Sequence, residues 1–331
     1  MDISVIICTH NPREDYLLRT LEAIKKQTLS KDRWELLLID NASKNRLSNH
    51  WDISWHGNAR HITENRLGLT PARLRGVKES RGKIVIFIDD DLVVASEFCA
   101  SIVSIAAKDE GAGGGSGKIF GEVSGALDWP AWMDPGLRLF LSVRDLGDEP
   151  FCVPPVDVPG GLPPGACVWY RRKLLDPWIG LIEGQKRRPL DRRGNQLWSD
   201  GDMELNHSVI EQGRHIRYDP TLTSVHMLPA ARIELAYFAQ LLYWVGRSSK
   251  RREVRRYEAQ KGRRPPAILS KMVRNPTAAA SQLLRALKLR PLPSAPEPNL
   301  SLEEIRKRLY GMIAIGRSDE ETLQSVCPWT L

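Results

Sequence analysis

The first third of the chain alternates short, continuous apolar runs with amphipathic stretches. The apolar runs Ile3–Cys8, Trp34–Ile39 and Ile84–Ile88 each predict a strand buried on both faces, because a parallel strand covered on both sides has no polar face. Apolar residues recur at helical spacing after Pro12 and again after Pro71, and proline favours the first turn of a helix. Such alternation of strands and helices is typical of a parallel α/β sheet.

The later part of the chain has a less regular pattern. Ser96 is the expected cap of a helix that begins near Phe98, and Gly111–Gly117 predicts a flexible loop before a strand at Lys118–Val123. The remaining predicted elements are a strand at 166–170, a helix at 202–212, a strand pair at 215–218 and 222–225, helices at 234–245 and 302–315, and linkers at 265–266 and 289–298. We therefore expect an α/β domain over residues 1–228 and a helical region over residues 229–331.

Polar side chains follow the three apolar runs at the points where the strands are predicted to end. These residues are Thr9 and Asn11 after the first strand, Asp40 after the second, and Asp89, Asp90 and Asp91 after the third. Because ligands of open parallel sheets bind beyond the carboxyl ends of the strands, the pattern predicts a site at one edge. Each cluster alone also fits turn chemistry. Three adjacent carboxylates, however, repel one another and favour a divalent cation such as Mg2+ or Mn2+, bound together with a diphosphate.

Several short segments, taken in order, resemble the signatures of family 2 glycosyltransferases. They are Ser4–Asn11, Leu38–Ser43, Glu64–Gly68, Ala72–Gly76 and Phe87–Asp91, followed by Gly201–Leu205, Asp219-Pro220 and His226. The resemblance covers roughly residues 3–228. It implies the GT-A fold, a Rossmann-like and mainly parallel sheet flanked by helices, here with a C-terminal helical extension. It also implies inverting hexosyl transfer from a nucleotide-diphosphate sugar, with a UDP-sugar favoured, to a hydroxyl of a saccharide or lipid-linked acceptor in polysaccharide or glycolipid biosynthesis.

The resemblance also implies roles for single residues. On the donor side, the nucleobase and ribose pocket is implied to be lined by Thr9, Asn11 and Asp40, with Arg73 near it. The other residues implied to bind the donor are Asn65, Asp89 and Asp90. Asp91 is implied to bind the Mn2+ or Mg2+ ion that bridges the diphosphate. His226 is implied to approach that ion, although a lone histidine is more often a hydrogen-bonded core residue. Asp202 matches the family's general base, and the small-residue acceptor motif is matched only loosely, by Gly160-Gly161 and Gly165-Ala166-Cys167.

The surroundings of Asp202 leave alternatives open. Gly201 stands where the family has a glutamate and Asp200 precedes it, so Asp200 is an alternative base. Ser199 and Asp202 also fit a capping box at the start of a helix. Trp198 is expected to stack on a sugar near the base, although a tryptophan is more often part of a core.

The net charge of +8 is concentrated in residues 247–290, which contain fourteen Lys and Arg but only two Glu. A solvated helical face is one interpretation, and contact with an anionic surface is another. Together with the helix at 234–245, this block suggests a peripheral membrane anchor. Alternatively, the same helix forms a homodimer interface through Tyr237, Phe238, Leu241, Leu242, Tyr243 and Trp244. Nucleic acid is not an expected partner of the enzyme.

Other classes of protein fit the sequence less well. The five cysteines are widely spaced without a CxxC pair, which disfavours a disulfide scaffold and a cysteine zinc site. No apolar run approaches the ~18–20 residues that span a bilayer, and the N-terminus does not have the pattern of a signal peptide. We therefore expect a cytoplasmic protein, free or on the inner face of the membrane.

Two alternative functions remain besides glycosyl transfer. A nucleotidyltransferase that makes nucleotide-diphosphate sugars would share the sheet and an aspartate-bound metal, but no Gly-rich basic phosphate loop follows the first apolar run. A non-catalytic protein that binds anionic surfaces through residues 247–290 would instead bind in a salt-dependent way. A dinucleotide oxidoreductase is disfavoured, because no GxGxxG follows Ile3–Cys8.

Overall fold

The computed structural model describes residues 1–125, 128–153, 162–184, 191–192, 196–199, 201–261, 294–297 and 299–326. The chain forms two compact units. The first contains residues 1–127, 135–189 and 201–229, and the second contains residues 128–134, 190–200 and 230–331. All strands found in the described residues belong to the first unit.

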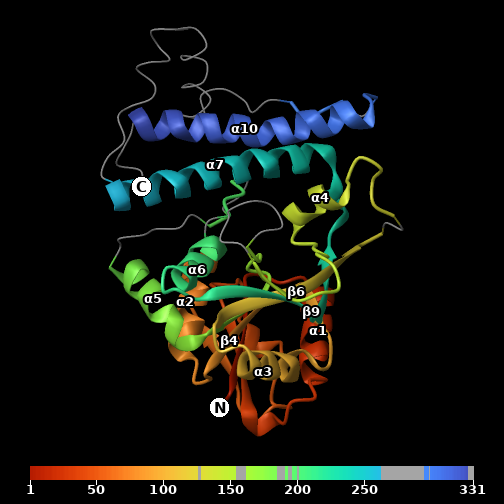
Figure 1. Ribbon diagram of the computed structural model, residues 1–331. Coiled ribbons are helices and arrows are strands. Elements are labelled where there is room, and N and C mark those ends of the chain that lie inside the picture. Colours follow the sequence, from red (N-terminus) through yellow and green to blue (C-terminus); the bar gives the residue numbers. More distant parts are fainter. Residues whose placement is uncertain are drawn as a thin grey trace. The chain divides into compact units, whose positions relative to one another are not determined.

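A single mixed sheet forms the centre of the first unit (Figure 1). Its order is β3-β2-β1-β4-β8-β6-β9-β5, and β7 pairs with β9. The strands are β1 Ile3–Thr9, β2 Trp34–Asp40, β3 Ala59–Thr63, β4 Ile84–Asp89, β5 Leu92–Val94, β6 Ala112–Val123, β7 Phe151–Val153, β8 Cys167–Arg171 and β9 His215–Leu228. β1, β2, β3 and β4 are parallel as expected, whereas β8 runs antiparallel to both of its neighbours.

Helices cover both faces of this sheet. The helices of this unit are α1 Glu14–Lys25, α2 Leu69–Glu79, α3 Phe98–Lys108, α4 Pro135–Arg138, α5 Asp176–Glu183 and α6 Gly201–Ile210. Short 3-10 turns lie at 31–33, 47–49, 139–141 and 172–175, and a further one at 230–233 belongs to the second unit. One core packs α1 and α3 against the sheet and includes Val5, and the other packs α2, α5 and α6 and includes Ile6. Neighbouring residues of β1 thus enter opposite cores, which explains why its apolar run is continuous.

The prediction of a flexible loop at Gly111–Gly117 is wrong, because β6 begins at Ala112. A Cβ atom added to Gly114 would lie 2.6 Å from the carbonyl oxygen of Trp169, and one added to Gly115 would lie 2.5 Å from that of Arg217. Real Cβ atoms do not approach backbone this closely. Glycine is therefore used here for the close approach of neighbouring strands rather than for flexibility.

The predicted strand pair at 215–218 and 222–225 is one continuous strand, β9. Its pairing with β6 shifts register around Gly117, where an added Cβ would lie 2.0 Å from the carbonyl oxygen of Leu222. A bulge therefore absorbs the Asp219-Pro220 interruption without ending the strand.

Two helix starts also differ from expectation. Ser96 does not cap α3: the residue at the cap position is Glu97, and it makes no side-chain capping hydrogen bond. The hydroxyl of Ser96 instead donates to the Glu97 carboxylate at 2.9 Å. α2 begins at Leu69, two residues before Pro71.

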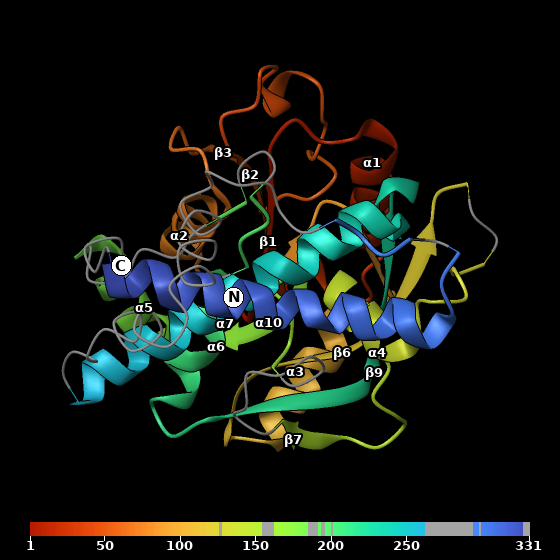
Figure 2. The same ribbon diagram turned by 90° about the horizontal axis from the view of Figure 1, so that it is seen from above.

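The second unit is built on two long helices, α7 Leu235–Lys261 and α10 Leu302–Val326, which lie side by side in both views (Figures 1 and 2). Both extend well beyond their predicted ends. Their backbones approach closely, because a Cβ on Gly246 would lie 2.1 Å from the carbonyl oxygen of Ile313 and one on Gly316 would lie 2.0 Å from that of Tyr243. The predicted linker at 265–266 and most of the linker at 289–298 lie outside the described residues.

The start of the basic block is buried in this unit, contrary to both surface interpretations. The buried cations are Arg247, Lys250, Arg251 and Arg252. Arg247 forms an ion pair with buried Glu320 at 2.5 Å, which offsets the cost of burying its charge. The remainder of the block, residues 262–290, lies outside the described residues.

The dimer interface predicted on α7 is not available either. Phe238, Leu241, Leu242, Tyr243 and Trp244 are all buried within the chain. The structure uses this apolar face for internal packing, so it gives no support to a homodimer through these residues. Within the described residues, no helix combines the length and the apolar character that crossing a membrane requires.

Candidate active site

The strand ends that the sequence singles out meet at one edge of the sheet. In the parallel register, Thr9 is the partner of Asp40 and Cys8 is the partner of Asp89. The hydroxyl of Thr9 donates a hydrogen bond to the Asp90 carboxylate, and this bond ties the end of β1 to the acidic triplet. The juxtaposition predicted from the apolar runs is therefore present.

The triplet Asp89-Asp90-Asp91 is electrostatically crowded. Burial raises the pKa of Asp90 to about 7, and repulsion from Asp91 adds to this, although the hydrogen bond from Thr9 acts in the opposite direction. Burial also raises the pKa of Asp89, and the nearby Arg73 guanidinium only partly compensates. Such a site gains stability from a cation, because positive charge relieves both effects.

His226 of β9 lies directly opposite the last carboxylate of the triplet. Its Nε2 atom lies 3.4 Å from Oδ2 of Asp91. The carbonyl oxygen of Leu141 can only accept, so the 2.9 Å hydrogen bond to it places a proton on Nδ1 of His226. In the neutral ring, the Nε2 lone pair then faces the carboxylate, and these two electron-rich atoms suit a shared cation.

The donor set at this point is one carboxylate and one imidazole. Across the described part of the chain, no group of three or more His, Cys, Asp and Glu side chains is arranged to hold a metal ion. Two protein ligands still fit a magnesium-type site, because such ions commonly keep water and substrate phosphates as their other ligands. Asp91 and His226 therefore fit an ion whose coordination a diphosphate completes.

Asp202, in the first turn of α6, is joined to the same edge by hydrogen bonds. Its Oδ2 accepts the backbone N–H of Gly165 at 3.1 Å, and its Oδ1 accepts that of Met203 at 3.0 Å. The carbonyl oxygen of Gly165 accepts a bond from Nη2 of Arg73 at 2.7 Å, and the same nitrogen lies 3.3 Å from Oδ1 of Asp89. Arg73, which is only 4% exposed, thus lies between the triplet and Asp202.

The residues assigned to the nucleobase pocket make mainly local contacts. Both oxygens of Asp40 accept backbone N–H groups at 3.0 Å, from Ser43 and Leu47, so this buried carboxylate has the turn role given above as its alternative. Asn11 adopts a left-handed backbone conformation, with φ of 48°. Its side-chain oxygen accepts the backbone N–H of Lys44 at 2.8 Å. Asn65 is exposed. Contact of these residues with a nucleoside stays a prediction.

Asn41 is a structural residue of the site that the sequence reasoning places beside Asp40 at the end of the second strand but gives no role of its own. Its Nδ2 donates to the carbonyl oxygens of Glu64 and Arg66, at 3.1 and 2.8 Å, and its Oδ1 accepts the N–H of Gly68 at 2.8 Å. It therefore fixes the segment before α2 to the end of β2. The available signal was its place directly after a strand-end aspartate, but its partners lie more than twenty residues further along the chain.

The structure gives no support to the active-site roles expected of Trp198 and Asp200, which precede α6 in the sequence. Asp200 lies outside the described residues, so its role as an alternative base is untested. Trp198 is 8% exposed in the second unit, where its ring packs at 4.8 Å against Trp244 and the guanidinium of Arg247 lies 5.1 Å from its centre. The core role, given above as the usual one for tryptophan, describes this packing.

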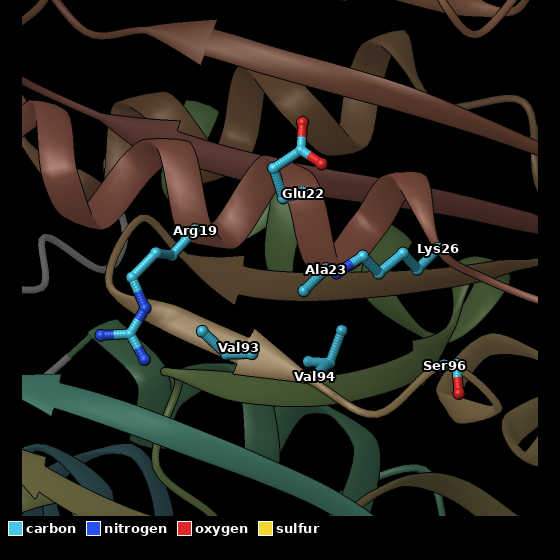
Figure 3. Close-up of a pocket in the computed structure, with 7 residues that line it drawn as sticks. All are labelled: Arg19, Glu22, Ala23, Lys26, Val93, Val94 and Ser96. Carbon is cyan, nitrogen blue, oxygen red and sulfur yellow. The ribbon is translucent and has the colours of Figure 1, made fainter.

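Two pockets elsewhere in the first unit lie apart from the sheet edge that carries the acidic triplet. One of about 330 Å3 lies between α1 and β5 and is lined by Arg19, Glu22, Ala23, Lys26, Val93, Val94 and Ser96 (Figure 3). Another of about 450 Å3 is lined by residues of α3 and β9, among them Arg217, and by Asp109, which follows α3. Neither is lined by a residue of the predicted site.

Comparison with known structures identifies the class of fold. The chain is similar to the crystal structure of S. aureus TarS 1-349 in complex with UDP-GlcNAc, with a TM-score of 0.51 and 16% sequence identity over 98% of this chain and 92% of that one. At this identity the likeness concerns the fold alone. The architecture is that of the GT-A glycosyltransferases, as the motifs predict.

Sequence comparison then gives a family match over part of the chain. Residues 4–156 match the family model for glycosyl transferase family 2, so the resemblance stated from the motifs is confirmed over these residues. Glycosyltransferase AglE of Haloferax volcanii is 29% identical over 92 residues, which are 27% of this chain and 30% of that protein. N-acetylgalactosaminyltransferase 7 of Rattus norvegicus is 32% identical over 113 residues, which are 32% of this chain and 17% of that protein. The matches thus span less than a third of either relative's length.

Proposed function

We propose that this protein is an inverting glycosyltransferase that moves a sugar from a nucleotide-diphosphate sugar to a hydroxyl group of an acceptor. The observation that carries the proposal is the arrangement at the sheet edge. An acidic triplet faces a histidine on one side, and a second aspartate, from a distant segment, is joined to the triplet through Arg73 and Gly165. The family match over residues 4–156 supports the same class of reaction.

Asp202 would act as the general base. Each of its oxygens already accepts one backbone N–H, from Gly165 or Met203, and these bonds orient the carboxylate. A carboxylate oxygen has a second lone pair, which is free in chemical principle to accept the proton of an attacking hydroxyl. Inversion follows when the hydroxyl attacks the anomeric carbon from the face opposite the diphosphate, and a single base is sufficient for this.

Asp91 and His226 would hold a divalent cation, Mn2+ or Mg2+. When bound, the ion would neutralise the charge that develops on the departing diphosphate. The tautomer that the Leu141 carbonyl selects keeps Nε2 of His226 free of a proton and directed at Asp91, as a metal ligand requires. Asp89 and Asp90 would hold the donor beside it.

A UDP-sugar is the donor we favour, since the structural relative from S. aureus was crystallised with UDP-GlcNAc. The proposed acceptor is a hydroxyl of a saccharide or of a lipid-linked acceptor in polysaccharide or glycolipid assembly. The proposed contact with an anionic membrane surface now rests on the part of residues 247–290 that follows the buried cations. Flotation with anionic liposomes at low salt would test it, and a protein that stays with the soluble fraction would contradict it.

The test combines nucleotide binding with transfer. Wild-type protein should bind UDP more tightly with Mn2+ than without, and should release free UDP rather than pyrophosphate when a UDP-sugar and an acceptor are supplied. Asp202→Asn should lower kcat by about 10²–10⁴-fold while leaving UDP affinity unchanged, because only the base is removed. Asp91→Asn should abolish the gain in UDP affinity from Mn2+.

The matched control is Asp148→Asn, on an aspartate whose side chain is 92% exposed. It removes the same charge and should leave both measurements unchanged. Near-normal turnover of Asp202→Asn would transfer the role of base to another group, with Asp200 the first to examine. An Mn2+ effect on UDP affinity that survives in Asp91→Asn would refute the proposed ligand.

A further inference from the structure

The segment Pro163–Ala166, which directly precedes β8, is held by hydrogen bonds on two sides. On one side, the carbonyl oxygen of Ala166 accepts the backbone N–H of Asp89 at 2.8 Å. On the other side, Nδ2 of Asn206, on α6, donates to the carbonyl oxygen of Pro163 at 2.9 Å. The hydroxyl of Tyr170 in turn donates to Oδ1 of Asn206 at 2.8 Å, so both ends of this buried amide are used. The segment therefore connects the triplet with the helix that carries Asp202.

Gly165 is the central contact of this segment. Its N–H donates to Oδ2 of Asp202 and its carbonyl oxygen accepts from Nη2 of Arg73. An added Cβ would lie 2.5 and 2.6 Å from the two terminal nitrogens of Arg73 and 2.7 Å from Cβ of Asp202. Arg73, Gly165 and Asp202 are thus packed with no space for an intervening side chain.

Arg73 is fixed on its other sides as well. Its guanidinium carbon lies 5.3 Å from the centre of the Phe87 ring, within the range of a cation–π contact. Nη2 reaches both Asp89 and Gly165, so a single nitrogen bridges the triplet and the segment that holds Asp202. A lysine side chain ends about one bond short of this nitrogen and has no planar fork, so it would keep the positive charge but not the bridge.

We propose that Arg73 is a positioning residue for the general base: through Gly165 it fixes the Asp202 carboxylate relative to the acidic triplet. This inference rests on the proposed function and adds a residue to it. It differs from the role near the nucleobase pocket that the resemblance implies, because Arg73 then acts on the base rather than on the nucleotide.

The two roles predict different kinetics. If Arg73 positions Asp202, Arg73→Lys should lower kcat for transfer by about 10–100-fold, since a displacement of about 1 Å in a reacting group has an effect of this size. Its Kd for UDP with Mn2+ should stay within about twofold of the wild-type value, because the positive charge beside Asp89 is kept. Arg75→Lys is the matched control: Arg75 lies on the same helix, is 42% exposed and pairs with Glu79, and its variant should match wild type in both measurements.

A second measurement needs no substrate. The Gly165 N–H should exchange with solvent at least about tenfold faster in Arg73→Lys than in wild type or in Arg75→Lys, because the segment loses its link to the triplet. Amide exchange followed by NMR would report this directly. If wild-type protein transfers no sugar but the Gly165 amide is deprotected in Arg73→Lys, the proposed function fails and the positioning contact stands.

Two results would overturn the inference. Equal losses in UDP affinity and in kcat would assign Arg73 to the donor pocket. An unchanged Gly165 exchange rate, with normal kcat, would mean that Arg73 does not position Asp202.

Discussion

Replacement of Gly165 by alanine tests the geometry of the site with a single added methyl group. The new Cβ would meet the Arg73 guanidinium at 2.5 and 2.6 Å and Cβ of Asp202 at 2.7 Å. Ordinary contacts of this kind lie at 3.4–4 Å, so the neighbours must separate by roughly 1 Å. The backbone at Gly165 has no left-handed φ, so the effect arises from lack of space rather than from backbone strain.

The size of the effect can be worked out on two scales. Overpacking of a buried site lowers the free energy of unfolding by about 1–3 kcal/mol, which a folded protein of this size tolerates. Displacement of the base by about 1 Å lowers kcat by about 10²-fold. The variant should therefore remain folded, with a reduced midpoint of urea unfolding, and lose most of its transfer activity.

The assay pairs urea unfolding with initial rates of UDP release at saturating donor and acceptor. Gly180→Ala is the control, because Gly180 lies within α5 and an added Cβ there has no heavy atom within 4 Å. That variant should gain about 0.5–1 kcal/mol from its higher helix propensity and keep full activity. If Gly165→Ala retained wild-type turnover, the contacts among Arg73, Gly165 and Asp202 would have no bearing on the reaction.

Two further predictions concern stability. His215 and Arg217 hydrogen-bond to Asp109, and although burial acts in the opposite direction, these contacts hold the pKa of Asp109 below its usual range. The folded state therefore favours the charged carboxylate, so its contribution is present above the unfolded pKa of about 4 and is lost as pH falls through the lowered value. Asp109→Asn should destabilise by about 1.5 kcal/mol at pH 7, and the difference should shrink as the pH falls below about 4; a constant difference would refute this. On α10, Gly316→Ala should lower Tm because its Cβ would lie 2.0 Å from a carbonyl oxygen of α7, whereas Gly311→Ala, with no atom within 4 Å, should not; equal Tm values would contradict the close packing of the two helices.

The central strands could be predicted because burial on both faces requires a continuous run of apolar residues, which is visible in the sequence. β1 sends Val5 into one core and Ile6 into the other, and both faces must then be apolar. The second half of β6, Lys118–Val123, is predicted correctly as a strand, but its first half is predicted as a loop because the same reasoning treats glycine as flexible. Its glycines are instead set by the carbonyl groups of β8 and β9, strands that lie far along the chain.

The candidate site divides in the same way. The acidic triplet and its place at the end of β4 follow from local sequence. The bridge from Arg73 to Asp202 does not, because Gly165 is 92 residues from one partner and 37 from the other. Arg247 illustrates the converse case: its local sequence suggests a solvated basic face, but its partner Glu320 lies 73 residues away and is buried with it.

A crystal structure of the protein with UDP and Mn2+ tests the central claim most directly. We predict a manganese anomalous peak bound by Asp91 and Nε2 of His226, with the UDP diphosphate completing its coordination and Asp202 facing the same cavity. Manganese and UDP bound elsewhere, or Asp202 turned away from the nucleotide, would contradict the account.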